Sequence, residues 1–304
     1  MDWFSPVFPD FKFDWDSAAA ILNHPFFQEP LLGLLLAAFS CSMLSVFVIM
    51  QRAVFAGPGT GCSFLAGLAF SYQFIPGLGG TEAMVWAVAG VFVLGMGWLT
   101  AFLNRSGWFT PDGAIGIILL GCLLLWFALS MGQEETSRVL IRYIFGESLE
   151  ITVLDLGFLA GTVLLASGLT FFGYKALYIF LFDSPFAGAL GFSPSRIHYL
   201  FFLILTLTLF ITIKTAGIFL ASAFLVLPGA SARLMTSRLT RMVLLSIFLA
   251  LISVLGGLAL AVTYPVFSRP VFIVMVQLMF FLVILLGSML KRNFSAPDHL
   301  DVAG

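Results

Sequence analysis

Charged side chains are scarce in this sequence. Asp, Glu, Lys and Arg make up 10% of its 304 residues, against roughly 25% in soluble globular domains. Hydrophobic residues make up 61%, and the mean hydropathy is +1.09. This composition excludes an ordinary soluble enzyme and predicts a polytopic membrane protein. The net charge of -1 argues against a nucleic-acid partner.

Residues that could form disulfides or catalyse a reaction are also few. The three cysteines, Cys41, Cys62 and Cys122, lie in or beside apolar runs, and an odd count predicts no disulfide framework. The sequence has no phosphate-binding P-loop, catalytic triad or metalloprotease pattern. We therefore expect a non-enzymatic chain that cannot hydrolyse ATP by itself.

The two ends differ from the middle. Residues 1–29 combine aspartates with aromatics and lack the basic start of a signal peptide, so we expect a segment lying on the outer membrane surface. Residues 30–292 form the predicted membrane domain. The polar tail, 293–304, is predicted to be disordered and cytoplasmic.

Uncharged runs long enough to cross a bilayer recur through the membrane domain. Because open sheets cannot cross lipid, we expect an all-α protein with about nine transmembrane helices, eight to ten being possible. The candidate spans are 31–50, 59–75, 83–104, 113–131, 156–174, 197–213, 215–232, 242–263 and 271–290.

The loop charges predict an orientation. With the N-terminus outside, most basic residues fall on the cytoplasmic side, as the positive-inside rule requires. These are Arg52, Arg105, Lys175, Arg196, Arg233, Arg238, Arg241, Lys291 and Arg292. On the outer side we expect Lys214 to reach outward to water, and Asp155 to be solvated at the end of a span.

Small residues and one proline mark points of close packing. Gly57 with Gly61, and Gly157 with Gly161, form two GxxxG pairs that we interpret as sites of helix packing. Pro228 lies inside the seventh span. It predicts a kink, which either lines a path through the membrane or is merely compensated by neighbouring helices.

A short polar segment interrupts the apolar runs at 183–191, with the sequence DSPFAGALG. Its charge, proline and glycines predict a compact element at the membrane boundary, suited to contact with a soluble partner. An ordinary interhelical loop is the alternative.

Several motifs in order resemble the zinc- and manganese-uptake permeases of bacterial ABC importers. They are DGAIGI (112–117), YIFGESL (143–149) followed by Asp155, DSPFAGALG (183–191), KTAGIFL (214–220) and LPGASAR (227–233). The resemblance covers about residues 25–292. It implies a type II permease fold, like that of the vitamin B12 importer.

The resemblance also implies roles for these segments. The coupling residues that contact the ATPase would be Asp183, Pro185, Ala187, Gly188, Leu190 and Gly191. Residues 143–150 would lie outside, near the docking site of a metal-loaded binding protein. The translocation pathway would include Cys62, Ser63 and Pro228.

The sequence departs from the family at the intramembrane metal pair. The family has an arginine followed by G-D-x-x-S-H, whose aspartate and histidine share a helix face. After Arg52, Pro58 stands at the aspartate position and Cys62 at the histidine position. Cys62 could itself be a soft metal ligand, a partner permease could hold the metal, or the substrate class could have shifted. His24, His198 and His299 are too scattered to replace the pair.

We therefore interpret the chain as the permease subunit of an ATP-driven importer of divalent metal, zinc or manganese, in a bacterial cytoplasmic membrane. The expected partners are cytoplasmic ATPases, a second permease in a homo- or heterodimer, an extracytoplasmic metal-binding protein and membrane lipid. No cofactor is expected apart from the transported metal. The alternatives are a siderophore or vitamin permease, and a non-transporting membrane scaffold.

Overall fold

A computed structural model describes residues 25–74, 82–105, 109–130, 143–146, 153–172, 194–263 and 268–294. These ranges contain nine long helices and no strand, which confirms the predicted all-α class. The helices are α2 (Pro25–Met50), α3 (Ala56–Phe74), α4 (Glu82–Arg105), α5 (Pro111–Ser130), α7 (Val153–Phe172), α10 (Pro194–Ala216), α11 (Ile218–Met235), α12 (Leu239–Thr263) and α13 (Arg269–Phe294).

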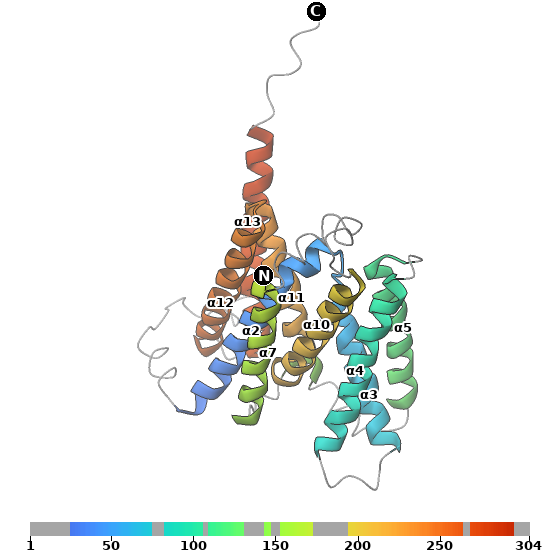
Figure 1. Cartoon of the computed structure of the whole chain (residues 1–304). Helices are drawn as coiled ribbons and strands as arrows, with labels where there is room; N and C mark the ends of the chain where they lie inside the picture. Colours follow the sequence, from blue (N-terminus) through green and yellow to red (C-terminus); the bar gives the residue numbers. More distant parts are fainter. Residues whose placement is uncertain are drawn as a thin grey trace, which may run out of the picture.

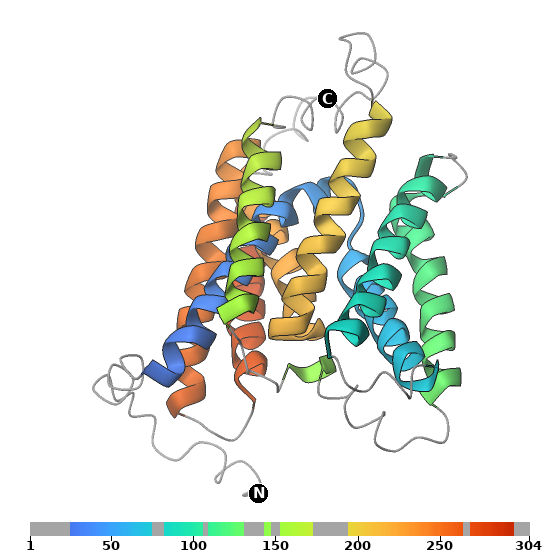
Figure 2. The same ribbon diagram turned by 60° about the horizontal axis from the view of Figure 1, so that its bottom comes forward.

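The helices fall into two groups joined by a pair (Figure 1). Helices α3, α4 and α5 pack together on one side, and α2, α7, α12 and α13 on the other. Helices α10 and α11 lie between the two groups and contact both. Figure 2 shows the same division from a second direction.

Each of the nine predicted spans corresponds to one of these helices. In the described part of the chain, all except α3 are long and apolar enough to cross a membrane. Helix α3 is less apolar because it carries Gly57, Gly59, Gly61 and Gly67. Most of its residues are buried against α4, α5 and α11. A helix enclosed by protein does not need a lipid-soluble surface, so α3 belongs to the membrane bundle despite its composition.

Helix α2 lies at the centre of the second group. Four small or sulfur-bearing residues of α2 each contact a different helix. In sequence order these helices are α10, α12, α7 and α11. The pairs are Cys41 Sγ with Thr212 Oγ1 at 3.4 Å, Ser42 O with Ser246 Oγ at 2.9 Å, Met43 Sδ with Ser167 Oγ at 3.8 Å, and Ser45 Oγ with the Gly229 N–H at 2.9 Å. The position of α2 is therefore defined from four sides.

The two GxxxG pairs have different outcomes. A side chain at Gly57 would approach Ser222 of α11 to 2.9 Å, and one at Gly61 would clash with Ile218 of the same helix. The packing interpretation is confirmed for this pair. Gly157 and Gly161 of α7 have no neighbour within 4 Å in the described part of the chain, so for this pair the packing interpretation stays a prediction.

Candidate functional site

The predicted coupling segment lies outside the described residues. This applies to Asp183, Pro185, Ala187, Gly188, Leu190 and Gly191, whose role stays a prediction. The helices on either side are described: α7 ends at Phe172 and α10 begins at Pro194. Both of these helix ends lie at the same end of the bundle as the ends of α2 and α4.

The two ends of the bundle carry different charged residues in the described part of the chain. Exposed arginines gather where α2, α4 and α11 finish, at Arg52, Arg105, Arg233, Arg238 and Arg241. We call this the arginine end. The opposite end carries Asp155, Lys214 and Arg269 at helix termini. The assignment of the arginine end to the cytoplasm stays a prediction.

Cys62 and Ser63 lie on α3 beside α5. The Ser63 hydroxyl is 3.0 Å from the Gly59 carbonyl, to which it donates, and 3.3 Å from Cys122 Sγ. Because the single hydroxyl proton goes to Gly59, the Cys122 thiol is the donor to Ser63 Oγ. Cys62 is half-buried on the adjacent position. Two thiols and a hydroxyl therefore gather where α3 meets α5, and sequence reasoning missed the contribution of Cys122.

No group of three or more His, Cys, Asp or Glu side chains that could hold a metal ion occurs among the described residues. Pro58 suits its position for a structural reason. It lies in the first turn of α3, where backbone N–H groups have no intrahelical acceptor, so a proline costs no hydrogen bond.

Asp112 holds the entry to α3. Its Oδ1 accepts a hydrogen bond of 3.1 Å from the Phe55 N–H, just before the helix begins. Asp112 itself lies in the first turn of α5. The motif DGAIGI (112–117) therefore connects the α2–α3 turn to α5 through this hydrogen bond. No local sequence pattern predicts the contact.

Pro228 is buried in α11, facing α2. A proline within a helix displaces the preceding turn, so nearby N–H groups lose their usual acceptors. The Gly229 N–H, next to the proline, donates to Ser45 Oγ of α2 at 2.9 Å. The neighbouring helix thus supplies an acceptor beside Pro228, and a role of Pro228 in the pathway stays a prediction.

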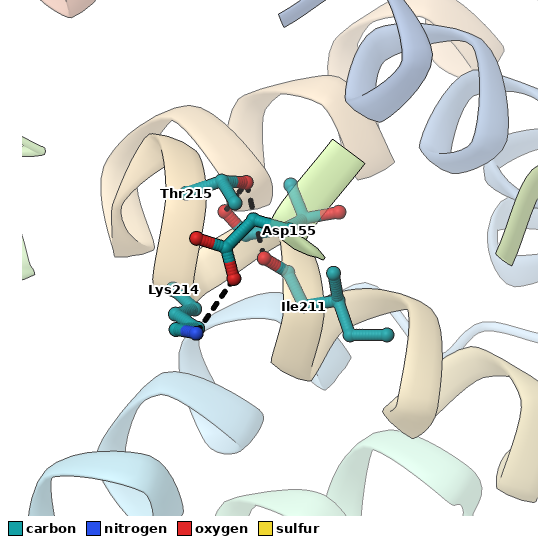
Figure 3. Close-up of polar contacts among 5 residues, drawn as sticks. Asp155, Ile211, Lys214 and Thr215 are labelled. Carbon is teal, nitrogen blue, oxygen red and sulfur yellow. Dashed lines mark hydrogen bonds and ion pairs between the residues drawn. The ribbon is translucent and has the colours of Figure 1, made fainter. Parts of the chain in front are cut away.

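An ion pair joins α7 and α10 at the opposite end. Lys214 Nζ lies 2.6 Å from Asp155 Oδ1 (Figure 3) and 4.5 Å from the centre of the Trp86 ring. Asp155 is only 6% exposed. The expectation that Asp155 is solvated is therefore wrong, whereas the Lys214 side chain is 27% exposed and still reaches the surface. Packing of α7 against α10 brings the two charges together, and removes the carboxylate from solvent.

Trp86, which Lys214 contacts, belongs to a cluster of aromatic rings. Tyr143 packs 5.6 Å from Phe64 and 5.5 Å from Trp86, and Phe64 lies 5.9 Å from Phe210, all between ring centres. We call these four rings the aromatic cap. They come from α3, α4, α10 and the turn at 143–146, so only the tertiary fold brings them together.

Two glycines let that turn approach the helices. Gly146 and Gly217 have φ angles of 72° and 87°, which residues other than glycine rarely adopt. A side chain on Gly217 would approach the Gly146 Cα to 2.6 Å. The backbone of the turn therefore lies directly against the break between α10 and α11.

His198 has a structural partner at the arginine end. Its Nε2 lies 3.1 Å from Asn104 Nδ2 of α4, and its ring packs 4.8 Å from Phe202. This contact joins the first turns of α10, which follow the predicted coupling segment, to the end of α4.

Known proteins resemble this chain over most of its length. The model of the ABC 3 transport family matches residues 23–287. The chain is 28% identical over 249 residues to the manganese transport system membrane protein MntC of Halalkalibacterium halodurans, covering 82% of each protein. It is 25% identical over 269 residues to the high-affinity zinc uptake system membrane protein ZnuB of Haemophilus influenzae, covering 88% of this chain and 97% of the relative.

A solved structure has the same fold. The structure of PsaBC from Streptococcus pneumoniae in complex with Fab matches with a TM-score of 0.72 at 24% identity. The match covers 88% of this chain and 94% of the other.

Proposed function

The chain belongs to the ABC 3 transport family, and on that premise we propose that it is the permease subunit of a bacterial importer of divalent metal, manganese or zinc. A permease of this kind is a transport subunit and leaves ATP hydrolysis to a separate ATPase. The observation that carries the proposal is the family match across residues 23–287, which includes all nine long helices except the C-terminal end of α13.

The mechanism we propose is alternating access. ATP binding closes the ATPases, and the segment 183–191 transmits that movement to α7 and α10, which flank it. The aromatic cap, with the Lys214–Asp155 pair, closes the opposite end of the bundle. At this end the rings pack against one another, and Asp155 balances the charge of Lys214. We therefore interpret the aromatic cap as a steric barrier to ions. The arginine end would face the cytoplasm, with the N-terminus outside.

The replaced metal pair suggests a division of labour between two permeases. Pro58 offers no side-chain donor, and a divalent ion needs several donors to replace its water shell. We propose that a partner permease with an intact aspartate–histidine pair supplies the ligands. This chain then supplies half of the pathway and one coupling surface. An extracytoplasmic metal-binding protein would deliver the ion.

The thiols between α3 and α5 favour a second candidate. The Cys122 thiol forms a hydrogen bond with Ser63, which is next to Cys62 in the sequence. A metal site at Cys62 would therefore have a second sulfur nearby. Thiolate ligands suit zinc or copper(I) better than manganese. In this reading the chain binds a soft ion by itself, and no ligand-bearing partner is required.

One experiment separates the two candidates. The chain is purified with its ATPase and any co-purifying permease, reconstituted in vesicles, and assayed for uptake of radioactive manganese and zinc. Under the division of labour, Cys62→Ala and Cys122→Ala leave uptake nearly unchanged. Under the soft-ion candidate, both abolish it. Cys41→Ala is the matched control, because this cysteine lies on α2 and bonds to Thr212.

Failure of metal transport altogether would point to the alternatives. Uptake of a metal chelate or vitamin, with no uptake of the free ions, would support the siderophore or vitamin reading. ATP hydrolysis unchanged by every substrate, in a complex that transports nothing, would support the scaffold and contradict the proposed importer.

A further inference from the structure

Three exposed arginines lie within residues 233–241, where α11 ends and α12 begins; we call this segment the α11–α12 turn. They are Arg233, Arg238 and Arg241. The ion pair of Lys214 with Asp155 lies at the opposite end of the bundle. The described part of the chain provides no counter-charge for these arginines.

The turn that carries the arginines is held in place. The Thr236 N–H donates to the Ala232 carbonyl at 3.1 Å, and the Met242 N–H to the Arg238 carbonyl at 2.9 Å. Leu239 is buried in the core. Because the backbone is anchored, the arginines are presented at defined positions, unlike charges on a long loop.

The placement of two of them opposes helix stability. Arg238 precedes α12 and Arg241 lies in its first turn, which contains no acidic residue. Positive side chains at the positive end of a helix dipole are unfavourable. Nothing in the described structure offsets this repulsion, whereas a bound anion would.

The surface next to the arginines is apolar. On α12, Leu244 is 63% exposed and Phe248 is 60% exposed, and helical spacing places both on the face of Arg241. Met235, at the end of α11, is also exposed. Exposed apolar side chains on a membrane helix suit contact with hydrocarbon, which would place the arginines beside them at the depth of the lipid headgroups. A soluble subunit would meet the end of the bundle, and not this flank.

We propose that the α11–α12 turn binds the headgroup of an anionic phospholipid. Arg238 and Arg241 donate to its phosphate, for which the planar guanidinium is well shaped. Arg233 adds a third positive charge. Leu244 and Phe248 contact the acyl chains. This inference concerns the membrane surface of the chain and does not depend on which ion is transported.

Native mass spectrometry of the full chain in detergent tests the proposal. The protein is titrated separately with phosphatidylglycerol and with zwitterionic phosphatidylcholine, and the first dissociation constant of each is measured. We expect phosphatidylglycerol to bind more tightly, and excess inorganic phosphate not to displace it. The double substitution Arg238→Gln/Arg241→Gln should weaken phosphatidylglycerol about tenfold, because each arginine near an anionic surface contributes separately to binding. Binding of phosphatidylcholine should not change.

The matched control is Arg105→Gln. It removes the same charge at the same end of the bundle, but from α4. There the exposed apolar residues Trp98 and Phe102 are followed by a single arginine. Its effect on phosphatidylglycerol should be much smaller. If the double variant does not fold, Arg238→Gln alone, outside α12, should still weaken binding about threefold.

Three results would overturn the proposal. The first is unchanged phosphatidylglycerol binding in the Arg238 and Arg241 variants. The second is equal weakening by Arg105→Gln, which would mean unspecific attraction to the whole end. The third is full displacement by inorganic phosphate, which would mean a site for a free anion. Loss of ATPase binding in the double variant, with lipid preference retained, would identify a protein-docking surface instead.

Discussion

Helices α2 and α5 are almost equally apolar, yet they occupy opposite environments. In the most apolar window, 72% of α2 is buried inside the protein, against 17% of α5. The difference lies in which residues interrupt the apolar sequence. Helix α2 carries serines, a cysteine and alanines on all sides, whereas α5 is rich in leucine, with Leu120 and Leu124 exposed.

This comparison separates two properties of a membrane helix. Apolar character decides whether a helix enters the bilayer, because backbone and side chains must leave water. Burial within the bundle depends on close packing and interhelical hydrogen bonds, since lipid is as apolar as leucine. The small polar residues of α2 provide both.

The largest expected contrast comes from deleting matched leucine side chains. Leu44 of α2 is fully buried, and Leu124 of α5 is 73% exposed. Leu44→Ala leaves a cavity and should destabilise the purified chain by about 2–4 kcal/mol. Leu124→Ala should change stability by less than about 0.5 kcal/mol. Denaturant unfolding in micelles measures both, and similar losses would refute the division between the two helices.

A matched pair of glycines should give the next largest contrast. A side chain at Gly229 would meet the backbone of Ser45, whereas Gly121 of α5 has no neighbour within 4 Å among the described residues. Gly229→Val should cost about 1–3 kcal/mol through overpacking, and Gly121→Val about nothing. If Gly121→Val impairs assembly of the complex but not the isolated chain, a partner subunit covers α5, which would refine the comparison.

The hydrogen bond behind Pro228 should contribute less. Ser45→Ala removes the acceptor of the buried Gly229 N–H, and should cost about 1–2 kcal/mol. Pro228→Ala restores a normal helix. In the double variant a regular helical turn offers the Gly229 N–H an acceptor within α11, so the cost of Ser45→Ala should fall by about half. Additive costs would show that Ser45 does not compensate the proline.

Among the contacts of α2, the smallest expected loss is at Ser246 of α12. Its hydroxyl already donates to the Val243 carbonyl at 2.8 Å, and shares that proton with the Ser42 carbonyl at 2.9 Å. Ser246→Ala should therefore cost only about 0.5–1 kcal/mol. Thermal unfolding followed by tryptophan fluorescence checks this. A cost above that of Ser45→Ala would reverse the order proposed for the contacts of α2.

Much of the fold could be predicted from local sequence. Each predicted span corresponds to a helix, because a run of apolar residues that must cross lipid has one economical structure. The replacement of the metal pair by Pro58 and Cys62 is also visible in the sequence. The coupling segment, although predicted from its motif, lies outside the described residues, so its role remains a prediction.

The candidate site was harder to predict because its parts are remote in sequence. Asp155 and Lys214 each sit at the end of an apolar run, where a charge is usually solvated. The sequence contains no signal that the first turn of α7 and the last turn of α10 lie side by side. Cys122 is likewise an ordinary apolar position until α5 packs against α3 and brings it to Ser63.

The sequence by itself determined that this protein is a bundle of membrane helices of the ABC 3 transport family, because composition and motif order are properties of the chain alone. The tertiary structure alone decided which helices are central. Burial, the Lys214–Asp155 pair and the aromatic cap depend on which faces meet. In a bilayer, hydropathy cannot distinguish those faces, since protein and lipid present equally apolar surroundings.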